Sequence, residues 1–266
     1  MPFATLGDLE FYWERGGHGP RLLYISGTGG DLRNRPGVFE GPLPESFDVL
    51  AYDQRGMGRS AKPSGPYSMA GYGDDAAALM REIGWDDALV FGVSFGGMVA
   101  QELVLRHPAR VRRLVLACTS PGGAGGASFP FHEIAHLTGE ARARTMIPIT
   151  DTRRDEAWAR ANPDAMQELV LLGSADPYAD EPGHAEGAAR QLAARRGHDA
   201  WDRLDQIRCP VLIAVGSYDG IALPETQRRM ADRIPGSQLR FFEGGHLFTM
   251  QDPTALPAIM DFLATP

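Results

Sequence analysis

The sequence lacks the features of a disulfide-stabilised or membrane-spanning protein. It has only 2 cysteines among 266 residues, each beside an apolar, strand-like run. Such cysteines are typical of buried free thiols in a reducing compartment. The most apolar long stretch, Leu89 to Leu105, is interrupted by Ser94, Gln101, Glu102 and three glycines. Because a bilayer does not readily accommodate these polar groups, the sequence contains no candidate transmembrane segment.

Basic residues are also scarce relative to acidic ones. Lys plus Arg number 26 and Asp plus Glu number 34, which gives a formal net charge of -8. A surplus of negative charge repels phosphate backbones, so nucleic acid is not an expected partner. The first 17 residues include Asp8, Glu10 and Glu14 and have no continuous apolar core, unlike a secretory signal. We therefore expect a cytoplasmic protein that binds neither nucleic acid nor membranes.

Short apolar segments bounded by turn residues alternate with helical patterns along most of the chain. This order predicts an α/β fold with a mainly parallel sheet and helices on both faces. The expected strands are Phe3–Leu6, Leu9–Glu14, Leu22–Ser26, Val49–Asp53, Ala88–Val93, Val111–Cys118, Val211–Gly216 and Gln238–Phe242. The expected helices around this sheet are Ser68–Ile83, a helix from Ser94 to about Arg106, and Glu225–Arg233.

The alternation stops after the sixth expected strand and resumes at Val211. The sequence between is mostly helical in pattern, with Met166, Leu169 and Val170 at i, i+3 and i+4 spacing. Because a strand pattern returns afterwards, we interpret this segment as a helical lid inserted into the core. A separate domain or plain surface helices are the alternatives. The predicted division is a core of residues 1–119 and 208–266 with a cap or lid of residues 120–207.

The clearest chemical signal is the pentapeptide Gly92-Val93-Ser94-Phe95-Gly96, which matches G-x-S-x-G. An expected strand precedes it and an expected helix follows, which is the context that this motif requires. A serine on so sharp a turn has strained backbone geometry, so the residues two before and two after it must be small. We predict that Ser94 is a nucleophile. The alternative is an inert serine in a glycine-rich or phosphate-cradling turn.

A neutral serine needs a base, and the base needs a group that orients it. Among the 7 histidines, His246 follows the last expected strand, on a loop at the same sheet edge as Ser94. His107 ends a helix, where the helix dipole explains a basic residue. The other five are expected to be polar surface or lid residues, with His132 and His136 as candidates to line a pocket. These five are His18, His132, His136, His184 and His198.

The orienting acid is expected at the end of another strand. The strand Val211–Gly216 leads into Ser217-Tyr218-Asp219-Gly220. Asp219 precedes His246 in the chain, which is the order that a nucleophile on this type of turn requires. The preceding strand ends in Thr119-Ser120 and offers no carboxylate. We predict that Asp219 is the acid; the alternative is an aspartate that only caps the following helix.

Acyl transfer also requires two N–H groups that stabilise an oxyanion. The backbone N–H of Phe95, at the start of a helix, is the first candidate. The second is expected in the loop Ser26-Gly27-Thr28-Gly29-Gly30 after the third strand. We choose Thr28, because a glycine on each side lets the backbone approach a substrate. A simple turn is the alternative.

Over nearly its whole length the chain resembles the α/β-hydrolase superfamily. The matching elements are Ser26-Gly27-Thr28-Gly29, Asp53-Gln54-Arg55-Gly56-Met57-Gly58-Arg59-Ser60, the turn at Ser94, Asp219 and Gly245-His246. Within the superfamily it is similar to 3-oxoadipate enol-lactonases, methylesterases and cofactor-free haloperoxidases. Relatives usually have His-Gly where this chain has Ser26-Gly27. In relatives the Asp53–Ser60 stretch is structural, so we expect Arg55 to brace loops.

The resemblance and the residues together imply a serine esterase or lactonase. Its expected partner is a small to medium ester or lactone; apolar lid residues suit an apolar substrate part, and no metal or organic cofactor is implied. The pairs Arg142/Arg144 and Arg153/Arg154 are interpreted as part of a solvated helix face, with binding of a substrate carboxylate as the alternative. The other functions left open are a perhydrolase or haloperoxidase-like enzyme and a ligand-binding protein with little turnover. A homo-oligomer is compatible with the sequence.

Overall fold

A computed structural model describes residues 2–265, and its centre is an eight-stranded sheet. The strands are β1 (Phe3–Leu6), β2 (Leu9–Gly17), β3 (Arg21–Ile25), β4 (Asp48–Tyr52), β5 (Ala88–Val93), β6 (Val111–Ala117), β7 (Val211–Gly216) and β8 (Gln238–Phe242). Their order across the sheet is β1-β2-β4-β3-β5-β6-β7-β8. The pairs β1–β2 and β2–β4 are antiparallel, and the remaining pairs are parallel. The expected mainly parallel α/β-hydrolase sheet is therefore confirmed.

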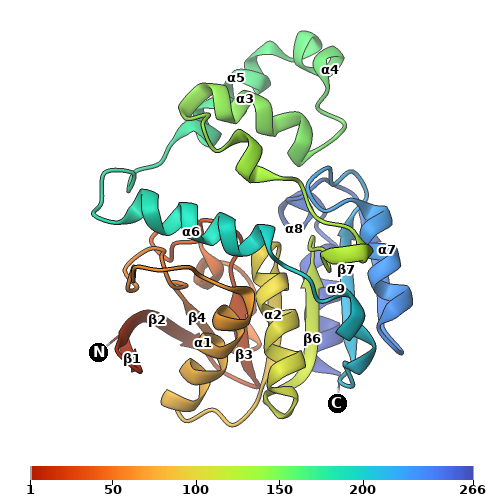
Figure 1. The fold of residues 1–266 in the computed structure, drawn as a ribbon. Coiled ribbons are helices and arrows are strands. Elements are labelled where there is room, and N and C mark those ends of the chain that lie inside the picture. The colour runs from red at the N-terminus through yellow and green to blue at the C-terminus, as the bar shows by residue number, and fades with distance from the viewer. Residues whose placement is uncertain (1, 266) are drawn as a thin grey trace.

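Helices cover both faces of this sheet (Figure 1). The helices outside the segment between β6 and β7 are α1 (Met69–Glu82), α2 (Phe95–Arg106), α7 (Pro224–Arg233), α8 (Phe248–Gln251) and α9 (Ala255–Ala264). Successive strand residues alternate between two hydrophobic cores, since Leu23 packs with α1 and α2 whereas Leu22 packs with α9. A β-strand places neighbouring side chains on opposite faces, so the fully apolar strands can supply both cores.

The ends of α1 show why the sequence pattern located it well. The Ser68 hydroxyl accepts a hydrogen bond from the Gly71 N–H and caps the helix start. Gly84, just after the helix, has φ +77, a left-handed conformation that glycine adopts without a steric penalty. The expected helix boundaries at residues 68 and 84 follow from this local chemistry.

The segment between β6 and β7, which we call the cap segment, contains four helices among its described residues. They are α3 (Gly139–Thr150), α4 (Glu156–Ala161), α5 (Pro163–Ser174) and α6 (His184–Arg196), with 3-10 turns η4 (Gly123–Gly125), η5 (Phe131–Ile134) and η6 (Trp201–Gln206). In Figure 1, α6 crosses between the sheet and the group formed by α3, α4 and α5. Met166, Leu169 and Val170 pack with Ala143 and Ile147 in a small separate core. Within residues 2–265, no helix is both long and apolar enough to cross a bilayer.

Candidate active site

Ser94 stands on the sharp turn that joins β5 to α2. Its φ and ψ are 55 and -116, an unusual conformation for a residue with a side chain. The turn closes only because its neighbours are small: a Cβ on Gly92 would lie 2.5 Å from the carbonyl oxygen of Gly96, and a Cβ on Gly96 would overlap that of Ile25. The two glycines of the motif are therefore required by backbone packing. Ser94 is 8% exposed, so a small part of it reaches the surface.

The structure brings Ser94, His246 and Asp219 together. His246 Nε2 lies 2.9 Å from Ser94 Oγ, and His246 Nδ1 lies 3.0 and 2.9 Å from the two Asp219 carboxylate oxygens. Ser94 follows β5, Asp219 follows β7 and His246 follows β8. The carboxyl ends of three parallel strands in the same half of the sheet therefore position these residues. An imidazole between a hydroxyl and a carboxylate can accept the hydroxyl proton while the carboxylate stabilises the resulting cation.

Backbone donors hold Asp219, which is 1% exposed. Its Oδ1 accepts hydrogen bonds from the N–H groups of Ile221 (2.8 Å) and Ala222 (2.9 Å). A buried carboxylate is costly unless it is hydrogen-bonded and paired, and here the donors and His246 meet both needs. Asp219 therefore also binds the backbone at the start of the following segment. This part of its role resembles the alternative interpretation, in which Asp219 only caps the helix that follows.

The cap segment fixes the loop that carries His246. The His246 N–H donates to the carbonyl of Thr150, at the end of α3, over 2.7 Å. The Gly245 N–H donates to Gln251 Oε1 over 2.7 Å, and Gln251 Nε2 in turn donates to Asp151 Oδ2 over 3.0 Å. A cap residue and a core residue therefore set the position of the imidazole together.

The loop after β3 lies beside Ser94, as expected. A Cβ on Gly27 would lie 3.5 Å from the Ser94 Cβ and 4.0 Å from its Oγ. Among residues 2–265, the backbone N–H groups of Thr28 and Phe95 have no hydrogen-bond partner, whereas the Gly29 and Gly30 N–H groups both donate. Two unpaired donors that flank a serine in this way are candidates to bind an oxyanion.

Three residues that the sequence interpretation missed hold this loop in place. Gln54 Nε2 donates to the Ser26 carbonyl over 2.9 Å, and Gln191 Oε1 on α6 accepts from the Gly29 N–H over 2.8 Å. The Asp53 carboxylate accepts from the backbone N–H of Leu32 (2.7 Å), and burial raises its pKa to about 6. Gln54 and Asp53 lie in the motif already noted, but Gln191 is 162 residues from Gly29 and no sequence pattern links them.

Arg55 braces two segments, as the resemblance implied. Its guanidinium makes two hydrogen bonds to Asp75 on α1, at 2.5 and 2.6 Å. Its backbone carbonyl accepts a third hydrogen bond from the Tyr72 hydroxyl over 3.1 Å. The motif loop is thereby joined to the helix that covers the sheet.

Two of the cap arginines are ion-paired. Arg144 pairs with Glu140 at 2.7 Å, and Arg153 pairs with Asp151 and Glu243 at 2.7 and 2.6 Å. They therefore do not present a free cation to a substrate. His198 lies in the cap segment, as expected of a lid residue, but it is not at the surface, since it is only 5% exposed.

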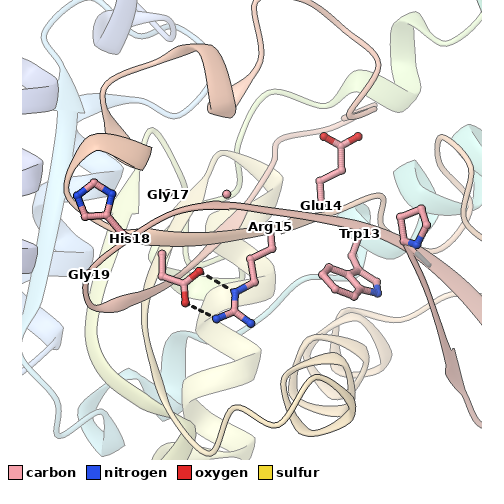
Figure 2. Close-up of a pocket in the computed structure, with 9 residues that line it drawn as sticks. Trp13, Glu14, Arg15, Gly17, His18 and Gly19 are labelled. Carbon is pink, nitrogen blue, oxygen red and sulfur yellow. Dashed lines mark hydrogen bonds and ion pairs between the residues drawn. The ribbon is translucent and has the colours of Figure 1, made fainter.

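A depression of about 770 Å³ lies along β2 and around the amino ends of β3 and β4 (Figure 2). Its lining residues are Pro2, Trp13, Glu14, Arg15, Gly16, Gly17, His18, Gly19 and Asp48. Asp48 begins β4 and Gly19 precedes β3, so they lie at the amino ends of strands whose carboxyl ends carry the site. Arg15 is neutralised there by Asp48, with two hydrogen bonds of 2.7 and 2.6 Å. We assign this depression no role in the chemistry.

No cluster of three or more His, Cys, Asp or Glu residues suited to a metal ion occurs in the described part of the chain. The two cysteines are free. Burial raises the pKa of Cys118 well above its usual value, with a further contribution from Asp219. A thiol that stays protonated is a poor nucleophile, so Cys118 is not a competing candidate to Ser94.

Comparison with known proteins agrees with the geometry. A family model described as serine aminopeptidase, S33, matches residues 44–249. The poly(3-hydroxyalkanoate) depolymerase of Ectopseudomonas oleovorans is 30% identical, over 91% of this chain and 83% of that protein. The 3-oxoadipate enol-lactonase 2 of Acinetobacter baylyi is 28% identical, over 96% and 89%. The crystal structure of the enol-lactonase from Burkholderia xenovorans LB400 superimposes with a TM-score of 0.79 at 24% identity, covering 99% of this chain and 100% of that one.

Proposed function

Because this chain belongs to the serine aminopeptidase S33 family of α/β-hydrolases, we propose that it cleaves a carboxylic ester or lactone, with Ser94 as nucleophile. The observation that carries the proposal is the continuous hydrogen-bonded series Ser94 Oγ, His246 and Asp219, with separations of 2.9 to 3.0 Å. The names of the depolymerase and lactonase relatives support an acyl–oxygen bond as the one that breaks.

In the first half of the proposed reaction, Ser94 Oγ attacks the carbonyl carbon while His246 Nε2 takes the hydroxyl proton. Asp219 holds the imidazole with Nδ1 protonated and stabilises the cation that forms. The N–H groups of Phe95 and Thr28 donate to the negatively charged oxygen of the tetrahedral intermediate. When the acyl–oxygen bond breaks, His246 returns the proton to the leaving alcohol, and the acyl group stays on Ser94.

In the second half, a water molecule replaces the alcohol beside His246. His246 takes a proton from this water as the oxygen attacks the acyl carbon, and the same N–H groups stabilise the second intermediate. The bond to Ser94 Oγ then breaks, Oγ regains the proton, and the carboxylic acid leaves. For a lactone the alcohol and the acid are parts of one released hydroxy acid.

The test is covalent labelling by a fluorophosphonate probe, measured by intact mass, together with hydrolysis of a panel of esters and lactones. We expect the wild type to gain one probe mass and the Ser94→Ala variant to gain none. Loss of Ser94 should reduce hydrolysis by roughly 10⁵- to 10⁶-fold, because the nucleophile and base act as a unit. Thr226→Ala serves as a matched control, since Thr226 is a buried hydroxyl on α7 outside the hydrogen-bonded series of Ser94, His246 and Asp219. An unlabelled wild type, or equal labelling of Ser94→Ala, would refute the proposal and favour a ligand-binding protein.

A further inference from the structure

Arg195, near the end of α6, is a buried cation without an acidic partner in residues 2–265. It is 7% exposed. Its guanidinium donates to the Phe129 carbonyl and the Ser128 hydroxyl, both at 2.7 Å, and Nε makes no hydrogen bond. It also lies over the Phe131 ring, 4.3 Å from its centre. All these groups are uncharged, so nothing described in the structure neutralises the arginine.

An unpaired buried charge is costly, and proteins rarely retain one without a use. Burial lowers the pKa of Arg195 to about 10, yet the group stays positively charged at neutral pH. The nearby carboxylate of Glu102 does not serve as its partner, since Glu102 is bound by Arg203 at 2.5 and 3.0 Å. The charge therefore has to be balanced by something from outside the described residues.

Arg195 lines a cavity of about 160 Å³ beneath the cap segment. The lining residues are Met98, Ser120, Gly122, Ala127, Ser128, Phe129, Pro130, His132, Leu192, Arg195, Arg196 and His198. They include two arginines and two histidines but no aspartate or glutamate. In a protein of net charge -8, this cavity is a locally positive site that favours an anion.

His198 adds a second polar group that lacks a strong partner. Burial lowers the pKa of its imidazole to about 4, so at neutral pH the ring is uncharged and keeps one N–H. Neither ring nitrogen forms a hydrogen bond of normal geometry within residues 2–265, although the Ser120 backbone lies near enough to raise the pKa slightly. A neutral donor beside a cation suits an acceptor with a single negative charge.

Two helices relate this cavity to the candidate active site. Met98 lies one turn of α2 after Ser94, whose carbonyl accepts a hydrogen bond from the Met98 N–H over 3.3 Å. Gln191 lies one turn of α6 before Arg195 and holds the Gly29 N–H of the loop beside Ser94. One helical turn advances about 5.4 Å, so each helix places a lining residue of the cavity one turn from a residue of the site.

From this arrangement we infer that the cavity is a subsite for a carboxylate carried by the substrate, with Arg195 and His198 as its ligands. The inference rests on the proposed function, and it narrows the substrate to an ester or lactone with a free carboxyl group. Of the two lining arginines only Arg195 is buried, since Arg196 is exposed to solvent. A carboxylate carries one negative charge and balances this one buried guanidinium, whereas a phosphate dianion would leave an excess. The volume is about five times that of a water molecule in the liquid, which accommodates a carboxylate and a few methylene groups.

The kinetic test compares each acid with its primary amide, which has nearly the same shape and no charge. The acyl-side pair is mono(4-nitrophenyl) glutarate and its amide, and the alcohol-side pair is 4-acetoxybutanoate and its amide. For at least one pair the wild type should prefer the acid in kcat/KM. Arg195→Met should reduce that preference by about 10- to 100-fold, the range for hydrogen bonds to a charged group. Arg195→Lys should retain much of it.

Arg190→Met is the matched control. Arg190 lies on the same helix as Arg195 and stands over the Tyr67 ring at 5.9 Å, but it does not line the cavity. Its substitution should leave the preference for the acid within about twofold, the ordinary scale of surface substitutions. Equal use of acid and amide by the wild type for both pairs would overturn the inference. So would a parallel loss on acid and amide in Arg195→Met, since that result indicates a structural arginine.

A binding measurement separates failure of the subsite from failure of the hydrolytic reaction. Calorimetric titration of Ser94→Ala with monomethyl glutarate and with its amide requires no turnover. We expect the acid to bind at least about 10-fold more tightly, and the Ser94→Ala/Arg195→Met double variant to lose this difference. Preferential binding without hydrolysis by the wild type would refute the reaction but keep the subsite. Hydrolysis without preferential binding or kinetic preference would refute the subsite alone.

Discussion

The substitution Asp219→Asn is the sharpest test of the proposed mechanism, because it keeps the shape of the side chain and removes its charge. The Ile221 and Ala222 N–H groups both point at Oδ1, so they will hold the amide oxygen of the asparagine there. The amide NH₂ then occupies the Oδ2 position, 2.9 Å from His246 Nδ1. An amide donor at that place forces Nδ1 to act as an acceptor, which puts the imidazole proton on Nε2 and prevents it from accepting the Ser94 proton.

The size of the effect follows from the charge alone. A carboxylate about 4 Å from the developing imidazolium charge stabilises it by about 4 kcal/mol at an effective dielectric constant of 20. Since 1.4 kcal/mol is a factor of ten, the loss of charge should reduce kcat/KM by roughly 10³-fold. The wrong tautomer adds to this, so we expect a total decrease of about 10³- to 10⁴-fold.

The assay is kcat/KM for the best ester in the panel, with thermal unfolding measured on the same samples. Asp252→Asn is the matched control. Asp252 also accepts hydrogen bonds from two backbone N–H groups, those of Glu243 (2.7 Å) and Thr254 (2.8 Å), but it is not bonded to a histidine within residues 2–265. We expect the control to keep its activity within about threefold, as for substitutions away from the chemistry. If a folded Asp219→Asn protein retains more than about a tenth of the activity, the assigned role of Asp219 is wrong.

Two further predictions concern the loop beside Ser94. Gln191→Leu leaves the Gly29 N–H without its acceptor, a cost of about 1–3 kcal/mol that should appear as a roughly 10-fold lower kcat with a smaller change in KM. Steady-state kinetics compare Gln191→Leu with Gln167→Leu, a variant in which an exposed cap glutamine is replaced. An unchanged kcat in Gln191→Leu contradicts the prediction. The Asp53 carboxyl keeps its proton up to pH about 6, whereas the unfolded chain releases it near 3.8, so the native state binds more protons between these values. The unfolding free energy, measured by chemical denaturation, should therefore fall by about 2.4 kcal/mol more in wild type than in Asp53→Asn as pH rises from 4 to 7. Equal slopes for the two proteins would refute this.

The sequence alone determined the central sheet and the residues that gather at its carboxyl edge. The strands are short apolar runs with turn residues at both ends, so their boundaries depend on local chemistry that the sequence displays. Ser94, His246 and Asp219 each follow such a strand directly, and parallel strands bring their carboxyl ends to one edge. The glycines around Ser94 have the same local origin, since they are required by the turn itself.

Only the tertiary structure decided which cap residues act on this edge. Gln191 reaches Gly29, Thr150 holds the His246 loop, and Arg195 shares a cavity with Met98, yet each is far in sequence from the residue that it meets. Helical patterns fix which face of a helix is apolar, but they do not fix where that helix crosses the sheet. The same lack of long-range information made Arg144 and Arg153 plausible carboxylate ligands, although their acidic partners occupy them. Whether a charge is neutralised depends on neighbours that only the folded chain supplies.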